Sequence, residues 1–328
     1  MKILYAVQGT GNGHLCRALD IIPILQQMAE VDVLVSGIQA DIELPFPVKY
    51  RLHGLSFIFG KSGGVDLWRT FMSSTVRKFV QEINSLPVER YDLIINDFEP
   101  ISAWACQTRD VPCIGLSHQI GALDPASPKP EESEMLGRFI MKNYAPSSIS
   151  YGFHFKAFNS NIFTPVIRKS IRELDPTDNG HYTVYLPSYD DAHLLKNLAK
   201  FPDVQWDVYS KHNKQKFVVK NVTINPIESE TFVRSMASAS GVLCGAGFET
   251  PAEALYLQKK LLVIPMKNQY EQHLNAATLE QMGVPVINSL KKKFDYDIES
   301  WLNSKNRVLV DYPDITKEII TSIVEKHR

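Results

Sequence analysis

The side chain best suited to acid–base chemistry is that of His14, which directly follows a glycine-rich turn in this chain of 328 residues. The turn, GTGNG at residues 9–13, comes after an apolar run and before an amphipathic stretch, so His14 is expected in the first turn of a helix. A helix N-terminus disfavours the imidazolium form, and a neutral imidazole can take a proton from a hydroxyl group. A histidine that only caps the helix or packs against it is the alternative.

Asp97 could orient this base, because it ends the apolar run YDLIIN and parallel strands carry functional groups at their carboxyl ends. The alternative is that Asp97 caps a helix beginning near Pro100. Glu99 and His118 also follow apolar runs and are expected at the same edge of the sheet. The glycine turn lacks the G-x-G-x-x-G spacing of a dinucleotide site and offers instead free backbone N–H groups at a helix N-terminus.

A second cluster, GAGFETPAE at residues 245–253, could bind an anion. Two glycines turn the chain after an apolar run, and Thr250 with Pro251 is expected to open a helix as its cap and first residue. The N-terminus of such a helix can receive a diphosphate. Glu253 then falls at the capping-box position, where it could close the cap or accept hydrogen bonds from both hydroxyl groups of a ribose. The acidic-Gln pair at 271–272 follows the next apolar run and could bind sugar hydroxyls.

Two α/β units are needed to bring these residues together. Apolar runs alternate with amphipathic stretches in both halves, which predicts an α/β protein with two Rossmann-like domains facing a cleft. A turn cluster at 175–180 separates them, so the domains are expected at 1–175 and 176–312, followed by a helix at 313–328. The expected strands are 2–8, 31–36, 91–96, 113–117, 181–186, 204–209, 217–224, 242–244 and 261–265. The expected helices are 14–28, 66–85, 101–108, 190–200, 230–238, 250–257, 271–281 and 315–327.

Composition excludes several classes of protein. The chain has 35 Lys+Arg against 36 Asp+Glu, so binding to nucleic acid through phosphate neutralisation is not expected. Four cysteines without a CxxC pair indicate reduced thiols in the cytoplasm rather than a disulfide scaffold. We expect neither a signal peptide nor a spanning helix, because the N-terminal apolar run is short and no run reaches 18 residues. The sequence shows no cluster of metal ligands.

The second cluster carries a family resemblance. GAGFETPAEAL followed by PMKNQYEQHLNAATLEQMG resembles the donor-binding signature of GT-B glycosyltransferases, shared by the plant UDP-glycosyltransferases and the peptidoglycan N-acetylglucosaminyltransferase. GTGNGHLCRA resembles the acceptor-side loop of the same superfamily, and DFEPISAWACQTRDVPCIGLSHQ looks close to a little-characterised prokaryotic branch. The resemblance implies the GT-B fold, in which the last helix crosses back to the first domain. A phosphate-binding histidine that the plant signature has near Gly245 is absent from this sequence.

The resemblance implies a role for each group of residues. His14 would be the catalytic base, with Asp97 as its candidate partner. The acceptor-side residues would be Gly9, Thr10, Gly11, Asn12, Gly13, Glu99 and His118. The donor-side residues would be Ser188, Ile227, Gly245, Ala246, Gly247, Thr250, Glu253, Glu271 and Gln272. Within the donor set, Glu253 would hold the ribose, the 245–250 backbone the diphosphate, Ile227 the uracil, and the pair at 271–272 the sugar.

The implied reaction moves a hexose or N-acetylhexosamine from a nucleotide-diphosphate donor, UDP-linked by this resemblance, to a hydroxyl acceptor by inverting displacement, without cofactor or metal. One alternative is a UDP-N-acetylglucosamine 2-epimerase, with Asp97 and Glu99 as acid and base. Another is a non-catalytic protein that binds nucleotide sugars. The aromatic- and glycine-rich segment 54–68 either packs partly on the core or forms a loop for the acceptor or a membrane surface, which leaves a peripheral membrane contact open.

Overall fold

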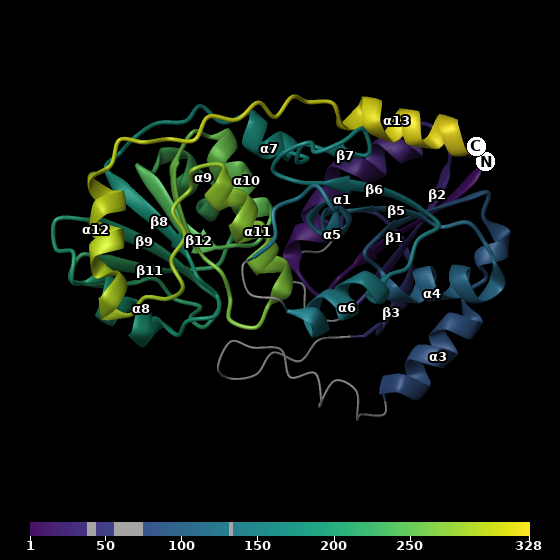
Figure 1. The fold of residues 1–328 in the computed structure, drawn as a ribbon, viewed down its shortest axis with the longest axis horizontal. Coiled ribbons are helices and arrows are strands. Elements are labelled where there is room, and N and C mark those ends of the chain that lie inside the picture. The colour runs from purple at the N-terminus through teal and green to yellow at the C-terminus, as the bar shows by residue number, and fades with distance from the viewer. Residues whose placement is uncertain (38–43, 56–74, 131–133) are drawn as a thin grey trace.

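The computed structural model describes residues 1–37, 44–55, 75–130 and 134–328. Its two sheets lie on opposite sides of the molecule, with helices packed around each (Figure 1). Apart from Gly54 and Leu55, the segment 54–68 lies outside the described residues, so its expected role as a loop for the acceptor or a membrane stays a prediction. The first part of the helix expected at 66–85 also lies outside them.

The first sheet has seven parallel strands in the described part of the chain, in the order β3-β2-β1-β4-β5-β6-β7. They are β1 (Lys2–Gln8), β2 (Glu30–Ser36), β3 (Val48–Leu52), β4 (Leu93–Asp97), β5 (Ile114–Ser117), β6 (Ile149–Phe153) and β7 (Ile162–Phe163). Successive side chains of β1 pack into different clusters, Ile3, Tyr5 and Val7 into one and Leu4 and Ala6 into another. Both faces of the sheet are therefore covered, which explains why its central strands are continuous apolar runs.

The helices of this first unit pack around its sheet (Figure 1). They are α1 (Asn12–Gln26), α3 (Thr75–Ser85), the short 3-10 turn η1 (Val88–Arg90), α4 (Pro100–Arg109), α5 (His118–Leu123), α6 (Met135–Tyr144) and α7 (Lys169–Arg172). We call the first sheet with these helices the N-terminal domain. Residues 121–134 hold three prolines and three glutamates, which predicts an exposed loop; the structure extends α5 to Leu123 and begins α6 at Met135.

The second sheet has the order β10-β11-β9-β8-β12-β13 and is parallel except for β10. Its strands are β8 (His181–Tyr185), β9 (Gln205–Ser210), β10 (Phe217–Val219), β11 (Val222–Pro226), β12 (Gly241–Gly245) and β13 (Lys260–Ile264). The single strand expected at 217–224 is wrong. The chain turns at Lys220, whose φ of 56° is left-handed, and forms the antiparallel pair β10–β11.

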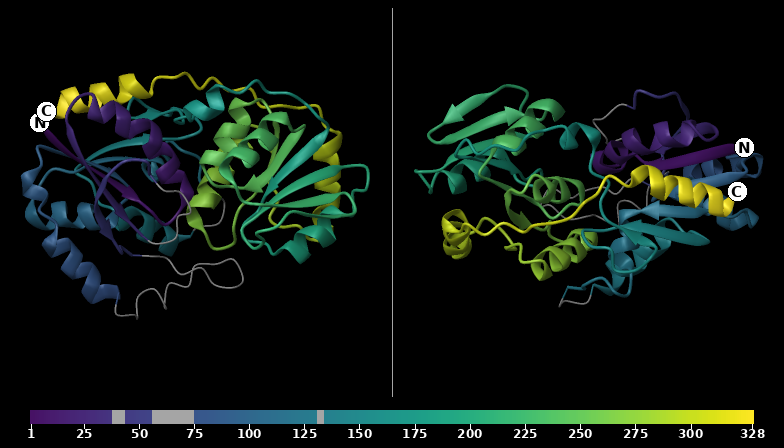
Figure 2. Two further views of the ribbon diagram at one scale, coloured as in Figure 1. Left: turned by 180° about the vertical axis from the view of Figure 1, so that it is seen from behind. Right: turned by 90° about the horizontal axis from the view of Figure 1, so that it is seen from above.

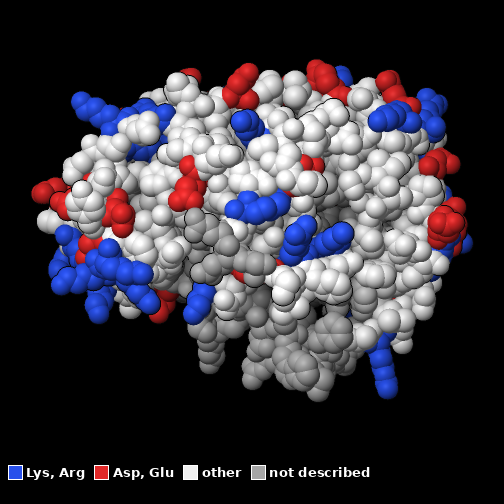
Figure 3. Space-filling view, viewed as in Figure 1, with Lys and Arg blue, Asp and Glu red and all other residues white. Residues whose placement is uncertain are grey.

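The helices of the second unit are α8 (Asp191–Leu198), α9 (Ser229–Ser238), α10 (Glu249–Tyr256), α11 (Tyr270–Gln281), the 3-10 turn η2 (Lys292–Phe294) and α12 (Asp295–Asn303). We call the second sheet with these helices the C-terminal domain. The boundary expected at 175–176 falls between the two sheets and stays a prediction. Lys and Arg side chains gather on the left of Figure 3, where the C-terminal domain lies.

The last helix, α13 (Thr316–His327), lies beside the N-terminal domain although it follows the C-terminal one in sequence (Figures 1 and 2). It packs on α1, and its buried face carries Ile319, Ile320, Ile323 and Val324 at helical spacing. Its His327 lies 2.9 Å, Nε2 to hydroxyl, from Tyr151 of β6. The chain therefore passes over both domains a second time before it ends.

Candidate functional site

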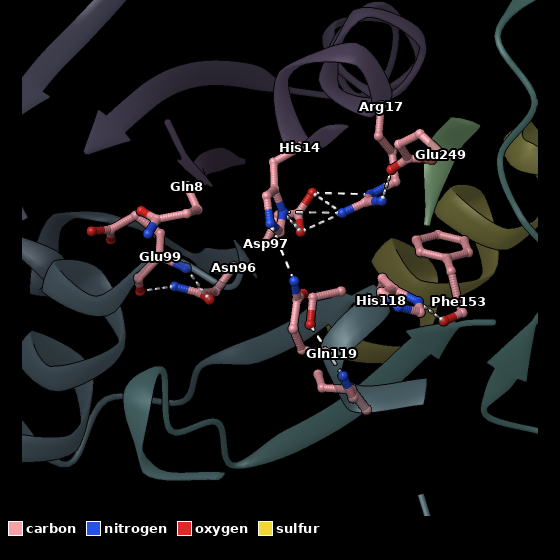
Figure 4. A network of polar contacts seen from close by, with 12 residues as sticks. Gln8, His14, Arg17, Asn96, Asp97, Glu99, His118, Gln119, Phe153 and Glu249 are labelled. Carbon is pink, nitrogen blue, oxygen red and sulfur yellow. Dashed lines mark hydrogen bonds and ion pairs between the residues drawn. The ribbon is translucent and has the colours of Figure 1, made fainter. Parts of the chain in front are cut away.

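The two domains meet through side chains that follow the carboxyl ends of their strands. Arg17 of α1 contacts Glu249 of α10, and Gln119 of α5 contacts Glu271 of α11. These helices follow β1, β12, β5 and β13, so the contacts join the functional edges of two parallel sheets (Figure 4). We call this contact region the domain interface.

His14 and Asp97 form a hydrogen-bonded pair at this interface. His14 is the third residue of α1, because the helix begins at Asn12 with Gly11 as its cap. Nδ1 of His14 lies 2.8 Å from Oδ1 of Asp97, which is fully buried at the end of β4. An ionised carboxylate only accepts, so Nδ1 carries the proton, and in the neutral imidazole Nε2 is then the nitrogen with the lone pair. Asp97 does not cap the following helix, whose N-cap is Glu99.

Arg17 fixes the charge of Asp97. It lies one turn after His14, is only 2% exposed, and donates from Nη2 to both carboxylate oxygens at 2.7 and 2.8 Å and from Nε at 3.0 Å. Burial alone would raise the pKa of Asp97, but the Arg17 and His14 side chains outweigh it and hold that pKa below its ordinary value. His14 is therefore oriented by a permanent anion.

Glu249 extends this network into the C-terminal domain. It opens α10, and its Oε1 accepts from Nη1 of Arg17 at 2.5 Å. The approach requires glycine at position 13, because a Cβ there would lie 2.9 Å from Cγ of Glu249. Burial raises the pKa of Glu249 to about 7, against the effect of Arg17 and with a contribution from Glu253. A carboxyl group that changes charge near neutral pH therefore stands at the N-terminus of α10.

The expected cap of α10 is wrong in position. The helix begins at Glu249 after Phe248, so Thr250 is its second residue and Glu253 its fifth, and the two do not form a capping box. Pro251 does not determine the residue at which the helix begins. The first N–H groups of a helix have no partner within it, so proline fits at any position of the first turn.

Glu253 is paired with Arg168, which lies on the chain between the two sheets. Nε and Nη2 of Arg168 donate to Oε1 and Oε2 of Glu253 at 2.5 and 2.8 Å, and the carboxylate is 3% exposed. This two-pronged contact uses one lone pair on each oxygen and leaves the others for hydroxyl groups. The role of Glu253 on a ribose stays a prediction.

Two residues expected on the acceptor side have other partners. Glu99 caps α4 and accepts from the N–H groups of Ile101 and Ser102 at 2.7 and 2.6 Å and from Oγ of Ser102 at 2.6 Å. The carboxylate is therefore taken up by the unpaired N–H groups at the start of α4, and its expected place on the acceptor side stays a prediction.

His118 is buried between the domains and does not line an open loop. Its ring stacks on Phe248 with centroids 3.7 Å apart, and its nitrogens lie 3.1 Å from the Phe153 carbonyl and 2.7 Å from Oδ1 of Asn275. Burial lowers the pKa of His118 well below its ordinary value. His118 therefore bridges the two domains in the structure, and its expected contact with the acceptor stays a prediction.

The two glycine loops border free space. A Cβ at Gly11 or Gly247 would meet no described atom within 4 Å. By contrast, one at Gly9 would lie 2.8 Å from Val35. Between Gly9 and Gly11, the Thr10 hydroxyl is buried and has no hydrogen-bond partner among the described residues. The loop after β1 and the loop after β12 are therefore open at Gly11 and Gly247.

The remaining donor-side residues also follow strands of the second sheet. Ser188 is exposed in the turn after β8, and Ile227 follows β11. Gly245 ends β12, and the carbonyl of Ala246 accepts from Nδ2 of Asn275 at 3.0 Å. At the start of α11, Oε1 of Gln272 accepts from the N–H group after Pro265 at 2.8 Å.

Two residues of the domain interface, Arg17 and Gln119, were not predicted from the sequence.

One family matches almost the whole chain: residues 1–304 match the family described as glycosyl transferase family 1. The chain belongs to glycosyl transferase family 1. No curated protein matches this glycosyltransferase. Among the described residues, no helix is long and apolar enough to cross a membrane. The same residues hold no group of three His, Cys, Asp or Glu side chains arranged to bind a metal ion.

Solved glycosyltransferases share the fold of this family member at low identity. MurG of Acinetobacter baumannii is 14% identical with a TM-score of 0.60, and the match covers 99% of each chain. UGT89C1 of Arabidopsis thaliana, complexed with UDP, is 14% identical with a TM-score of 0.59, covering 99% of this chain and 94% of that one. SnogD of Streptomyces nogalater is 12% identical with a TM-score of 0.54, covering 99% of each. The predicted GT-B fold is confirmed.

Proposed function

We propose that this glycosyltransferase moves a hexose or N-acetylhexosamine from a UDP-linked donor to a hydroxyl acceptor with inversion at the anomeric carbon. The observation that carries the proposal is the 2.8 Å contact between His14 and Asp97, which leaves Nε2 of His14 as a lone-pair nitrogen at the domain interface. Arg17 contacts Asp97 and Glu249 at once, so the base lies beside the N-terminus of α10.

The donor diphosphate would bind at the N-terminus of α10. The backbone at 245–250 can present N–H groups there, the helix dipole favours an anion, and Gly247 borders free space. The solved structure of UGT89C1 with UDP supports a nucleotide-diphosphate ligand for this fold. Glu253 would accept the ribose hydroxyls on the lone pairs that Arg168 leaves free. The other proposed donor contacts come from Ser188, Ile227, Glu271 and Gln272.

In the proposed step, the acceptor oxygen attacks the anomeric carbon while the bond from that carbon to the diphosphate breaks. The hydroxyl proton moves to Nε2 of His14, and the electron pair of the broken bond leaves with UDP. Asp97 stabilises the imidazolium that forms. Backbone N–H groups at 245–250 would stabilise the leaving diphosphate, so the proposal assigns no step to a metal ion.

Transfer fits the carboxylates better than sugar epimerisation does. An epimerase of this kind would use Asp97 and Glu99 as acid and base, but Asp97 is bound by Arg17 and His14, and Glu99 caps α4.

For the location of the enzyme we propose the cytoplasm, since all four cysteines are free and buried thiols.

Binding of UDP tests the donor site. UDP, UDP-glucose and UDP-N-acetylglucosamine are expected to raise Tm in a thermal-shift assay, because a ligand at 100 times its Kd adds about 2.7 kcal/mol to native stability. Glu253→Ala is expected to weaken UDP binding by roughly 10-fold or more, since a hydrogen bond to a charged group contributes about 1.5–3 kcal/mol. Isothermal calorimetry measures this loss.

The control is Glu280→Ala, which removes an exposed carboxylate from α11. It should bind UDP as the wild type does. Unchanged affinity in a folded Glu253→Ala variant would remove the ribose role. If none of the three nucleotides binds the wild type, the UDP-linked donor is wrong.

A further inference from the structure

Gln119 links the base to the donor side of the interface through one amide group. It is the second residue of α5 and is only 3% exposed. Its Nε2 lies 3.3 Å from Nε2 of His14 and 3.1 Å from Oε2 of Glu271, which lies in the first turn of α11 in the other domain. Figure 4 shows the amide directly below the His14 ring. The two N–H bonds of one amide therefore reach both domains.

The orientation of this amide is fixed by its neighbours. Glu271 presents a carboxylate oxygen and His14 presents the lone pair of Nε2, so both require the NH2 end. Turning the amide over would place its oxygen against two acceptors. In the observed orientation Oε1 of Gln119 is buried and has no hydrogen-bond partner among the described residues. A buried acceptor without a partner costs stability, so the unpaired Oε1 of Gln119 indicates a functional role for this side chain.

We propose that Gln119 is a positioning residue for glycosyl transfer. It holds His14 and Glu271 in register across the domain interface and keeps Nε2 of His14 in place until the acceptor hydroxyl binds there. The incoming hydroxyl replaces the amide on Nε2 of His14, while a substrate hydroxyl donates to the unpaired Oε1 of Gln119. This inference rests on the proposed function, because it assumes that His14 is the base and that Glu271 faces the donor sugar.

The charged groups around His14 do not replace this contact. Asp97 of β4 and Arg17 of α1 lie at Nδ1, on the other side of the ring from Nε2. Glu249 of α10 is bound to Arg17, and Glu271 of α11 reaches His14 only through the Gln119 amide. Among the described residues, Gln119 is thus the donor that the structure gives to the lone pair of Nε2.

Turnover tests the positioning role. Gln119→Ala is expected to lower kcat for UDP release from UDP-glucose or UDP-N-acetylglucosamine, with water as the hydroxyl that takes the sugar, by about 10- to 100-fold, the range for a misplaced reacting group. Its calorimetric affinity for UDP should be unchanged, because the amide of Gln119 is hydrogen-bonded, within the described residues, to His14 and Glu271 and not to the 245–250 loop. Gln119→Asn keeps the amide but shortens its reach and should fall similarly. Gln107→Ala removes an exposed glutamine of α4 and should keep the wild-type kcat.

A spectroscopic measurement tests the contact without turnover. In spectra of 15N-histidine-labelled full-length protein, His14 is identified by the signals lost in His14→Ala. We expect a protonated Nδ1 and an unprotonated Nε2, and Gln119→Ala should move the Nε2 signal to higher chemical shift as the donated hydrogen bond disappears. A folded Gln119→Ala variant with wild-type kcat, or with an unmoved Nε2 signal, overturns the inference. A wild type that releases no UDP contradicts the proposed function, and the Nε2 signal then still decides the role of Gln119.

Discussion

Replacement of Asp97 by asparagine is expected to lower kcat by about 10⁴-fold, the size of effect seen when the orienting carboxylate of a catalytic histidine becomes an amide. Arg17 donates three hydrogen bonds to this side chain and would take the amide oxygen of the variant. The NH2 end would then face Nδ1 of His14, which must become the lone-pair nitrogen. The proton moves to Nε2, so the nitrogen at the domain interface can no longer act as a base.

The kinetic loss in Asp97→Asn should leave donor binding in place. UDP release from UDP-glucose or UDP-N-acetylglucosamine gives kcat, and calorimetry gives the affinity for UDP, which we expect to match the wild type. Asp295→Asn is the matched control, because Asp295 stands at the start of α12 and pairs with Lys200, on the side of the C-terminal domain away from the N-terminal domain (Figure 1). A folded Asp97→Asn variant with the turnover of this control would show that Asp97 does not orient the base.

The largest effect on stability is expected for Arg17→Met, which should lower the free energy of unfolding by about 3–5 kcal/mol. The guanidinium is the shared partner of Asp97 and Glu249, and the side chains of Arg17 and Asp97 are almost wholly buried. Methionine fills much of the space but leaves two carboxylates without their counter-charge. Urea denaturation at pH 8 measures the loss.

The deficit of Arg17→Met should shrink as the pH falls. Without the guanidinium, Asp97 loses the main partner that holds its pKa below the ordinary value, and the pKa of Glu249, already raised to about 7 in the wild type, rises further. Protonation below this range removes the unpaired charges, so the variant should recover stability towards pH 5 relative to the wild type. Arg234→Met, which breaks an exposed pair with Glu230, should change stability by less than about 1 kcal/mol at either pH. An equal effect of both substitutions would show that the buried network contributes little.

Most strands of both sheets could be predicted from the sequence, including β13 at one edge of the second sheet, but β3, β6 and β7 of the first sheet could not. Strands β1, β8, β9 and β13 lie within one or two residues of the expected ranges, because strands buried on both faces form continuous apolar runs. Strand β3 lies at the edge of its sheet and alternates half-buried and exposed residues, so no such run marks it. Strand β7 has only two residues.

Within the site, the sequence predicted residue types but not partners. His14 and Asp97 stood out because a base and a carboxylate followed apolar runs. Arg17 and Gln119 did not, since their contacts with Asp97 and Glu271 join positions 80 and 152 residues apart. Asp97 was the residue that the sequence offered as a cap for α4, but the structure assigns the cap to Glu99, two residues later.

The role of His14 as the base is the central claim, and the turnover of His14→Ala tests it most directly. UDP release from UDP-glucose and UDP-N-acetylglucosamine is measured for this variant and the wild type at saturating donor, with His327→Ala as a control on the distant helix α13. We expect kcat of His14→Ala to fall by about 10²–10⁴-fold while its affinity for UDP persists, and the control to keep the wild-type rate. A His14→Ala variant that releases UDP as fast as the wild type would contradict the account.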